Sequence, residues 1–161
     1  MVHILNEFAR SSAEIRSRLY DKTNILVEHL TYICLSPNNI NRNHWITEIH
    51  SFIDHVDILK STKKFPTKDF IYKSTYGDSR DLFTNTTFMT KFIRAILKKE
   101  NIKTDLTLDE IITIVDSVCT QYFSWLSKEL SETGFVDRDE VEEKVNELIP
   151  SWIRKDIFHN D

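Results

Sequence analysis

Glycine and proline are scarce in this chain of 161 residues, which contains two glycines and three prolines. Average proteins have about 7% glycine and about 5% proline, and sheet proteins place both at their many turns. The scarcity therefore favours long helices joined by short polar loops. Two glycines are also too few for the glycine-rich loop that holds phosphates in common nucleotide-binding folds.

Other signatures are missing as well. No run of about 18 apolar residues exists, so we expect no membrane span. The first residues lack a basic region followed by an apolar stretch, so we expect no secretory signal and a cytoplasmic protein. There is no Cys-x-x-Cys pair for structural zinc and no Gly-x-Ser-x-Gly serine motif. We expect no cofactor and no reaction of the commoner hydrolase type.

The apolar residues that are present recur at three- and four-residue steps. This period predicts helices over 3–35, 42–60, 87–100, 108–132 and 137–149, with shorter ones after Pro66 and from 151 to 158. The length and the ordinary apolar fraction of 40% fit one domain. The sequence thus predicts an all-α, single-domain bundle of about six helices over residues 1–161, with no sheet.

Local signals place the ends of the later helices. Thr107 to Glu110 and Asp137 to Glu140 both have the spacing of a capping box, which predicts helix starts at these two positions. Gly134 followed by Phe135 predicts a helix end with a hydrophobic contact made by Phe135. Trp45 lies on an inner helix face and is expected in the core.

Cys34 and Cys119 each lie on an apolar helical face. A free cysteine packs as a small apolar side chain, so we expect two buried, reduced thiols. A disulfide is the alternative, and it would require an oxidising compartment.

His44, Glu48 and His55 share one strip of the 42–60 helix, at about 100° per residue. A His-x-x-x-Glu pair can bind a divalent metal, and a facing helix could add His29 or Glu28. His44 and His55 are about 16 Å apart along the axis, too far to share one ion. A metal-dependent helical-bundle enzyme using His44 and Glu48 is therefore the third functional hypothesis, against the interpretation that these are solvated or hydrogen-bonded side chains.

Two further sets of residues invite a functional interpretation. His50 and Asp54 are spaced as an exposed i,i+4 pair on the opposite, polar side of the same helix. Trp125 and Trp152 fit the core less clearly than Trp45, and a tryptophan beside a polar rim can anchor a partner.

Charge is divided unequally along the chain. Residues 1–103 hold 16 Lys and Arg against 11 Asp and Glu, whereas residues 104–161 hold 5 against 14. Residues 60–103 form a basic stripe with a net charge of +7. Its helical part carries Lys91, Arg94, Lys98 and Lys99, which could contact phosphates. A nucleic-acid-associated protein is the alternative hypothesis. The solvated face of an amphipathic helix is the simpler explanation of the stripe, and no sequence-reading motif accompanies it.

The acidic segment that opens the last long helix holds Asp139, Glu140, Glu142 and Glu143. The helix dipole favours some of this charge, but the density exceeds what capping requires. Small acidic inhibitors of nucleases and toxins use such surfaces, which is an analogy of charge only. We therefore predict a non-enzymatic protein-binding module, in the form of an immunity, antitoxin or adaptor protein, that uses these carboxylates and Trp152. We also expect reversal of Glu142 and Glu143 to cost the isolated fold little.

Overall fold

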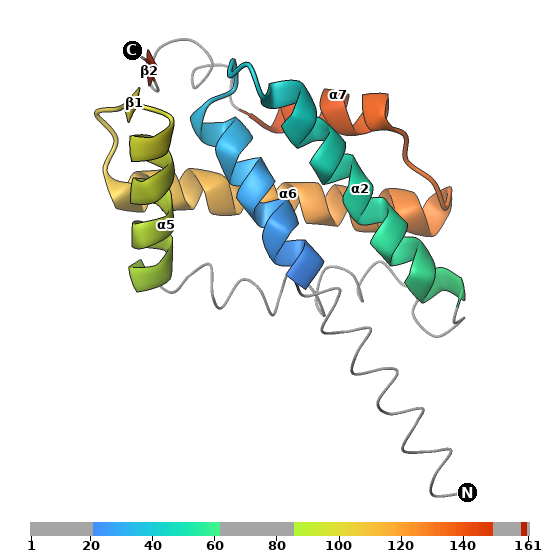
Figure 1. Ribbon diagram of the computed structural model, residues 1–161. Helices are drawn as coiled ribbons and strands as arrows, with labels where there is room; N and C mark the ends of the chain where they lie inside the picture. The colour runs from blue at the N-terminus through green and yellow to red at the C-terminus, as the bar shows by residue number, and fades with distance from the viewer. Residues whose placement is uncertain (1–20, 62–85, 150–158, 161) are drawn as a thin grey trace, which may run out of the picture.

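The computed structural model describes residues 21–61, 86–149 and 159–160 (Figure 1). They form five helices and one pair of short strands. The helices cover residues 21–35, Arg42–Ser61 (α2), Thr86–Lys99 (α5), Leu108–Glu132 (α6) and Arg138–Leu148 (α7). The mostly helical, all-α prediction is confirmed for this part of the chain. Residues 3–20 of the first expected helix and the short helices after Pro66 and from 151 to 158 lie outside it, so six helices in one domain stay a prediction.

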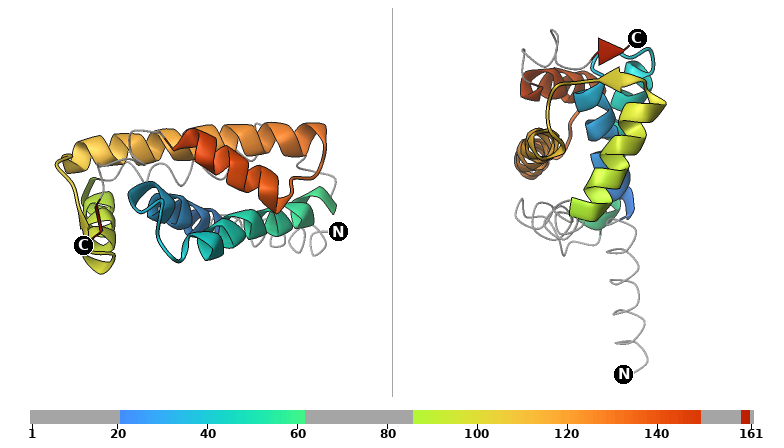
Figure 2. Two further views of the ribbon diagram at one scale, coloured as in Figure 1. Left: turned by 90° about the horizontal axis from the view of Figure 1, so that it is seen from above. Right: turned by 90° about the vertical axis from the view of Figure 1, so that its left-hand side faces the viewer.

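The longest described helix, α6, runs along one side of the arrangement and has 25 residues. The residue 21–35 helix and α2 lie in a layer that faces it (Figure 2). α7 contacts both α2 and α6, and α5 stands across the end of α6 where that helix begins. α7 runs back from the end of α6 toward its middle, away from α5 at the start of α6.

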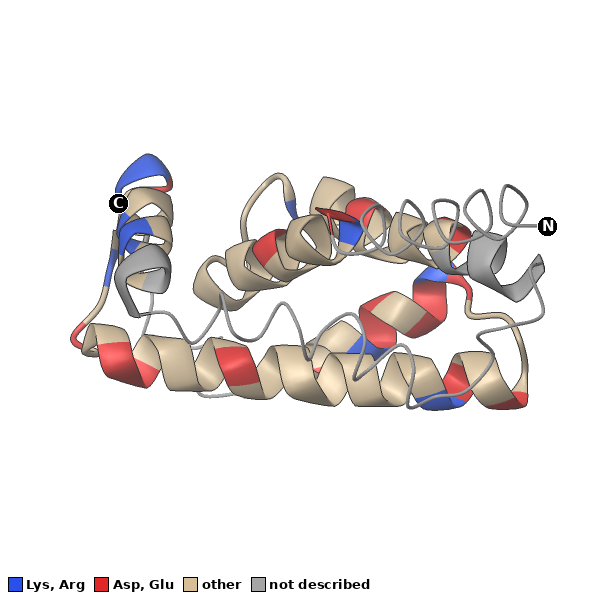
Figure 3. Ribbon diagram, turned by 90° about the horizontal axis from the view of Figure 1, so that it is seen from below, with Lys and Arg blue, Asp and Glu red and all other residues tan. Residues whose placement is uncertain are grey.

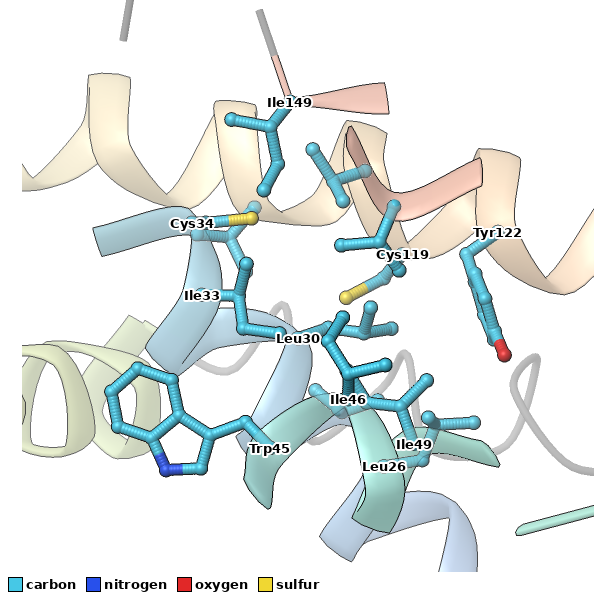
Figure 4. Packing of buried hydrophobic residues seen from close by; sticks show 14 of the residues in the cluster. Leu26, Leu30, Ile33, Cys34, Trp45, Ile46, Ile49, Cys119, Tyr122 and Ile149 are labelled. Atoms are coloured by element: carbon cyan, nitrogen blue, oxygen red, sulfur yellow. The ribbon is translucent and has the colours of Figure 1, made fainter. Parts of the chain in front are cut away.

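The apolar stripes of all five helices meet in one buried cluster (Figure 4). Trp45 is 6% exposed and stacks on Tyr32 with ring centroids 5.2 Å apart, which confirms its expected place in the core. α7 contributes Val141 and Val145. The largest fully buried side chains are Leu26, Leu30, Ile33, Leu35, Ile46, Ile49, Ile93, Tyr122 and Phe123.

Both predicted caps are present. The Thr107 hydroxyl accepts a hydrogen bond from the Glu110 N–H at 3.2 Å, and the Asp137 carboxylate accepts one from the Glu140 N–H at 2.8 Å. Each bond satisfies a backbone donor that has no partner within its own helix. The two caps fix where α6 and α7 begin.

Gly134 ends α6 as predicted. Its φ of 76° is left-handed, and its N–H donates to the Leu130 carbonyl at 3.1 Å. The expected contact of Phe135 is wrong, because this side chain is 63% exposed, whereas Val136 is fully buried. In extended chain, neighbouring side chains point to opposite sides, so only one of the two can face the core.

The strands β1 (Ile102–Lys103) and β2 (His159–Asn160) pair antiparallel, with Ile102 opposite Asn160 and Lys103 opposite His159. The pair is confined to two residues in each strand, so the described fold remains all-α as expected. Asn101, with a left-handed φ of 53°, follows the end of α5 and precedes β1. Two residues are too few to show the alternation by which a strand is recognised in sequence.

Candidate partner-binding surface

The exposed side of α7 carries a row of carboxylates. Asp139, Glu143 and Glu147 follow one another at four-residue steps, which places them on one face of the helix. All three are exposed, and they lie opposite the buried Val141 and Val145. Glu147 was missed in the sequence analysis; its spacing from Glu143 is the signal that identifies it. We call Asp139, Glu140, Glu143 and Glu147 the acidic face of α7.

Glu140 lies among other negative groups. Partial desolvation, together with the charges of Asp137 and Glu129, raises the pKa of the Glu140 carboxyl above its usual value. Glu143 adds to this effect. A set of like charges that repel one another favours the approach of a positively charged surface.

Glu142 belongs to the interior side of α7. Its Oε1 accepts from Arg42 of α2 at 3.0 Å, and its Oε2 accepts from Arg138 at 3.2 Å. The hydrogen bond and charge of Arg42, aided by Arg138, hold the pKa of Glu142 below its usual value despite partial desolvation. The expectation that reversing Glu142 costs the fold little does not fit these contacts, because a lysine there would face two guanidinium groups.

The same arginines make further contacts between α7 and α2. Arg138 donates to the Thr47 hydroxyl and to the Asn43 carbonyl, both at 3.1 Å. Arg42 also donates to the Asn146 side-chain oxygen. We call Arg42, Glu142 and Arg138 the α2–α7 clamp. It fixes the orientation of α7, so that the acidic face points away from α2.

The two uncertain tryptophans do not join this surface in the described residues. Trp125 is half-buried, packs against the core cluster and lies with its ring 5.6 Å from that of Tyr122. Trp152 lies outside the described residues, so its role as a partner anchor stays a prediction.

The exposed face of α5 is basic. Lys91, Arg94 and Lys98 are all exposed and lie on one side of the helix, with the small Ala95 between them. Figure 3 shows several Lys and Arg positions in blue on this helix. We call these three the basic face of α5. Lys99 turns away from it and places its Nζ 5.8 Å from the centre of the Tyr32 ring. The remainder of the basic stripe, over residues 62–85, lies outside the described residues.

The candidate metal pair is close but exposed. His44 Nε2 lies 3.9 Å from Glu48 Oε1, and the His44 side chain is 68% exposed. Partial burial, with a smaller effect of Lys22, lowers the pKa of His55. Within the described part of the chain, no three His, Cys, Asp or Glu side chains gather to hold an ion.

The ligands proposed from the facing helix have other contacts. His29 Nδ1 donates to the Ile25 carbonyl at 2.7 Å, and Glu28 accepts from the Tyr32 hydroxyl at 2.8 Å. These side chains act within their own helix, and neither contact brings them to His44.

The expected exposed pair of His50 and Asp54 is wrong for His50. Its Nε2–H donates to the Val136 carbonyl at 3.1 Å, and the residue is half-buried. The connection between α6 and α7 crosses this side of α2, which the helical period of α2 alone cannot show. His50 thus satisfies a backbone carbonyl instead of supporting an exposed ion pair.

No known protein family, curated protein sequence or solved structure matches this chain. Among the described helices, none combines the length and the apolar character needed to cross a bilayer. Over the described residues, the fold is mostly helical and has two exposed helix faces of opposite charge.

Proposed function

We propose that this chain is a non-enzymatic protein-binding module whose acidic face on α7 engages a basic surface of another protein. The observation that carries the proposal is that α7 separates two kinds of carboxylate. Glu142 is used by the clamp, whereas Asp139, Glu143 and Glu147 point outward and are exposed, and Glu147 pairs with Lys144 of the same helix at 3.3 Å. An immunity, antitoxin or adaptor role is the concrete form of this function.

Two physical features support the proposal. The clamp and the buried Val141 and Val145 hold α7 in place before any partner arrives, so little ordering is needed on binding. Exposed like charges create a field that accelerates the encounter with an oppositely charged protein. The face of α7 is mostly charged, so we expect electrostatics to act on the association rate more than on the lifetime of the complex.

The test compares the parent with two variants of equal net charge. The α7-reversed variant carries Asp139→Lys, Glu143→Lys and Glu147→Lys. The charge-matched control carries Asp54→Lys, Asp109→Lys and Glu132→Lys, which are exposed carboxylates of α2 and α6. Each triple change moves the formal net charge from −4 to +2. Asp109 matches Asp139, because both lie in the first turn of a helix.

Each protein is immobilised and exposed to extract of the native host, and the captured protein is then purified for stopped-flow measurement. We expect the parent and the control to retain the same basic protein at low salt, and the α7-reversed variant to associate with it at least about tenfold more slowly. The difference should shrink as salt screens the charges. Equal association rates for the parent and the α7-reversed variant at every salt concentration would remove the basis of the proposal.

A further inference from the structure

The two charged faces lie on different parts of one copy of the chain. α5 stands across the beginning of α6, whereas α7 begins past the end of α6 and runs back toward its middle (Figure 1). α7 packs on α2 and α6, and α5 packs on α6 and β1. Among the described residues, Lys91, Arg94 and Lys98 form no ion pair with a carboxylate of their own copy. Within the described part of the chain, these exposed cations therefore have no carboxylate that neutralises them.

The faces match in length and in polarity. Lys91 to Lys98 extends over about 10 Å, and Asp139 to Glu147 over about 12 Å. In an antiparallel arrangement, Lys98 at the end of α5 would lie beside Asp139 at the start of α7. This order also places the negative end of one helix dipole next to the positive end of the other. Ala95, small and exposed in the middle of the basic face, lets a second helix approach closely.

We propose that the basic face of α5 in one copy docks on the acidic face of α7 in a second copy, in a head-to-tail contact. The inference rests on the proposed function in one respect: it uses the same face of α7, so a second copy and the partner protein compete for it. The contact is heterologous, which means that each added copy leaves one basic and one acidic face open.

The contact is weak and depends on salt. Exposed ion pairs contribute at most about 1 kcal/mol each, so three of them support a dissociation constant no tighter than about 10⁻² M. Self-association should therefore appear only at high protein concentration and low ionic strength. A free partner with a larger basic surface would displace the second copy from α7.

Sedimentation equilibrium of the purified full chain at millimolar concentration tests the contact. At about 10 mM salt, we expect the weight-average mass to rise with concentration, and at about 1 M salt to stay at that of one chain. The α5-reversed variant, with Lys91→Glu, Arg94→Glu and Lys98→Glu, should remain monomeric in both conditions. A concentration-independent mass of the parent at low salt would overturn the proposal.

Mixing the variants identifies the two faces. The α5-reversed and α7-reversed variants should each fail to self-associate, yet associate with one another, because their altered faces are complementary again. The charge-matched control has the same net charge as the α7-reversed variant, so any added association in its mixture with the α5-reversed variant should be weaker. Both mixtures keep one native pair of complementary faces, so equal association would show that the two altered faces do not recognise each other and would refute the specific contact. Thermal melts confirm that each variant is folded.

The two proposals fail in different ways. The α5-reversed variant keeps the acidic face, so it should bind the partner protein as the parent does while losing self-association. If the parent self-associates through these faces but the α7-reversed variant captures the partner unchanged, the proposed function is wrong and the self-contact stands. If the parent does not self-associate but the α7-reversed variant loses the partner, the self-contact is wrong and the proposed function stands.

Discussion

At the level of single residues, burial controls the chemistry of Cys34 and Cys119. Both thiols are free and are at most 1% exposed in the core (Figure 4). Burial raises the pKa of Cys34 to about 12 and that of Cys119 well above its usual value. Since the thiolate is the nucleophile, neither group should react while the core is closed. The buried positions agree with the interpretation of both residues as small apolar core side chains.

We therefore expect a thiol reagent such as DTNB to label the native chain at least about 10³-fold more slowly than a small free thiol, because labelling requires opening of the core. In guanidinium chloride, both thiols should react at once. The release of thionitrobenzoate at 412 nm measures both rates. Rapid labelling of the native chain would contradict the buried placement, and less than two equivalents after unfolding would point to oxidation.

Residue-level predictions succeeded where local sequence decides the outcome. Trp45 and the caps at Thr107 and Asp137 depend on helix period and on contacts three residues apart, which the sequence contains. His50 and Phe135 were misassigned because a distant segment decides their surroundings. Val136 occupies the core next to Phe135, and its carbonyl lies 86 residues from the His50 ring that binds it.

At the level of helices, the α2–α7 clamp makes a prediction for stability. Glu142→Gln keeps the shape of the side chain but removes the charge between Arg42 and Arg138. We expect a loss of about 1–2 kcal/mol in the free energy of unfolding, because charge-assisted hydrogen bonds are exchanged for weaker ones. Glu143 is the next residue and is exposed, so Glu143→Gln should change the free energy of unfolding by less than about 0.5 kcal/mol. Urea denaturation at pH 7 measures both, and equal values would argue against the clamp.

The same clamp predicts a pH dependence. The pKa of Glu142 is lower in the folded chain than in the unfolded chain, so its contribution is fully present above the unfolded value, near 4.3. It is lost as pH falls through the folded value. The difference in stability between the parent and Glu142→Gln should therefore shrink between about pH 5 and pH 3. Urea midpoints across this range test it, and a constant difference would place the cost of the substitution elsewhere.

Helix positions could be predicted from the sequence, but the contacts between helices could not. The ranges of α2, α5, α6 and α7 follow from apolar period and capping residues that are local. The clamp joins Arg42 to a carboxylate 100 residues away, and no local pattern distinguishes Glu142 from the exposed Glu143. The sequence thus identified the acidic segment as a group. Only the fold shows that Glu142 contacts arginines while Glu143 is exposed.

For the molecule as a whole, the contrast in charge between residues 1–103 and 104–161 is visible in the sequence. Its placement in space is not, because it depends on the length of α6 and on where α5 and α7 meet it. The fold places the basic face on α5, across the start of α6, and the acidic face on α7, beside its later half, and no ion pair joins the two helices among the described residues. Each charged face can then contact a different molecule. The acidic face lies within residues 104–161, the more acidic part of the chain.

The nucleic-acid alternative is tested at this scale too. Three cations on the basic face of α5 can neutralise about three phosphates, so log K should fall with log salt with a slope no steeper than about −2.7. The chain carries a formal net charge of −4, which opposes the approach of a polyanion. We expect a dissociation constant of about 10⁻⁴ M or weaker for any duplex at physiological salt.

Fluorescence anisotropy with a labelled duplex and a labelled single strand measures this affinity, for the parent and for the combined variant Lys91→Ala, Arg94→Ala and Lys98→Ala. Lys128→Ala, at an exposed position of α6, serves as the control. We expect the combined variant to bind the partner protein as the parent does, because the proposed partner surface is the acidic face of α7 and not α5. Submicromolar binding of either nucleic acid that the combined change abolishes and the control preserves would instead assign the basic face of α5 to phosphate recognition, and the nucleic-acid hypothesis would replace the protein-binding one.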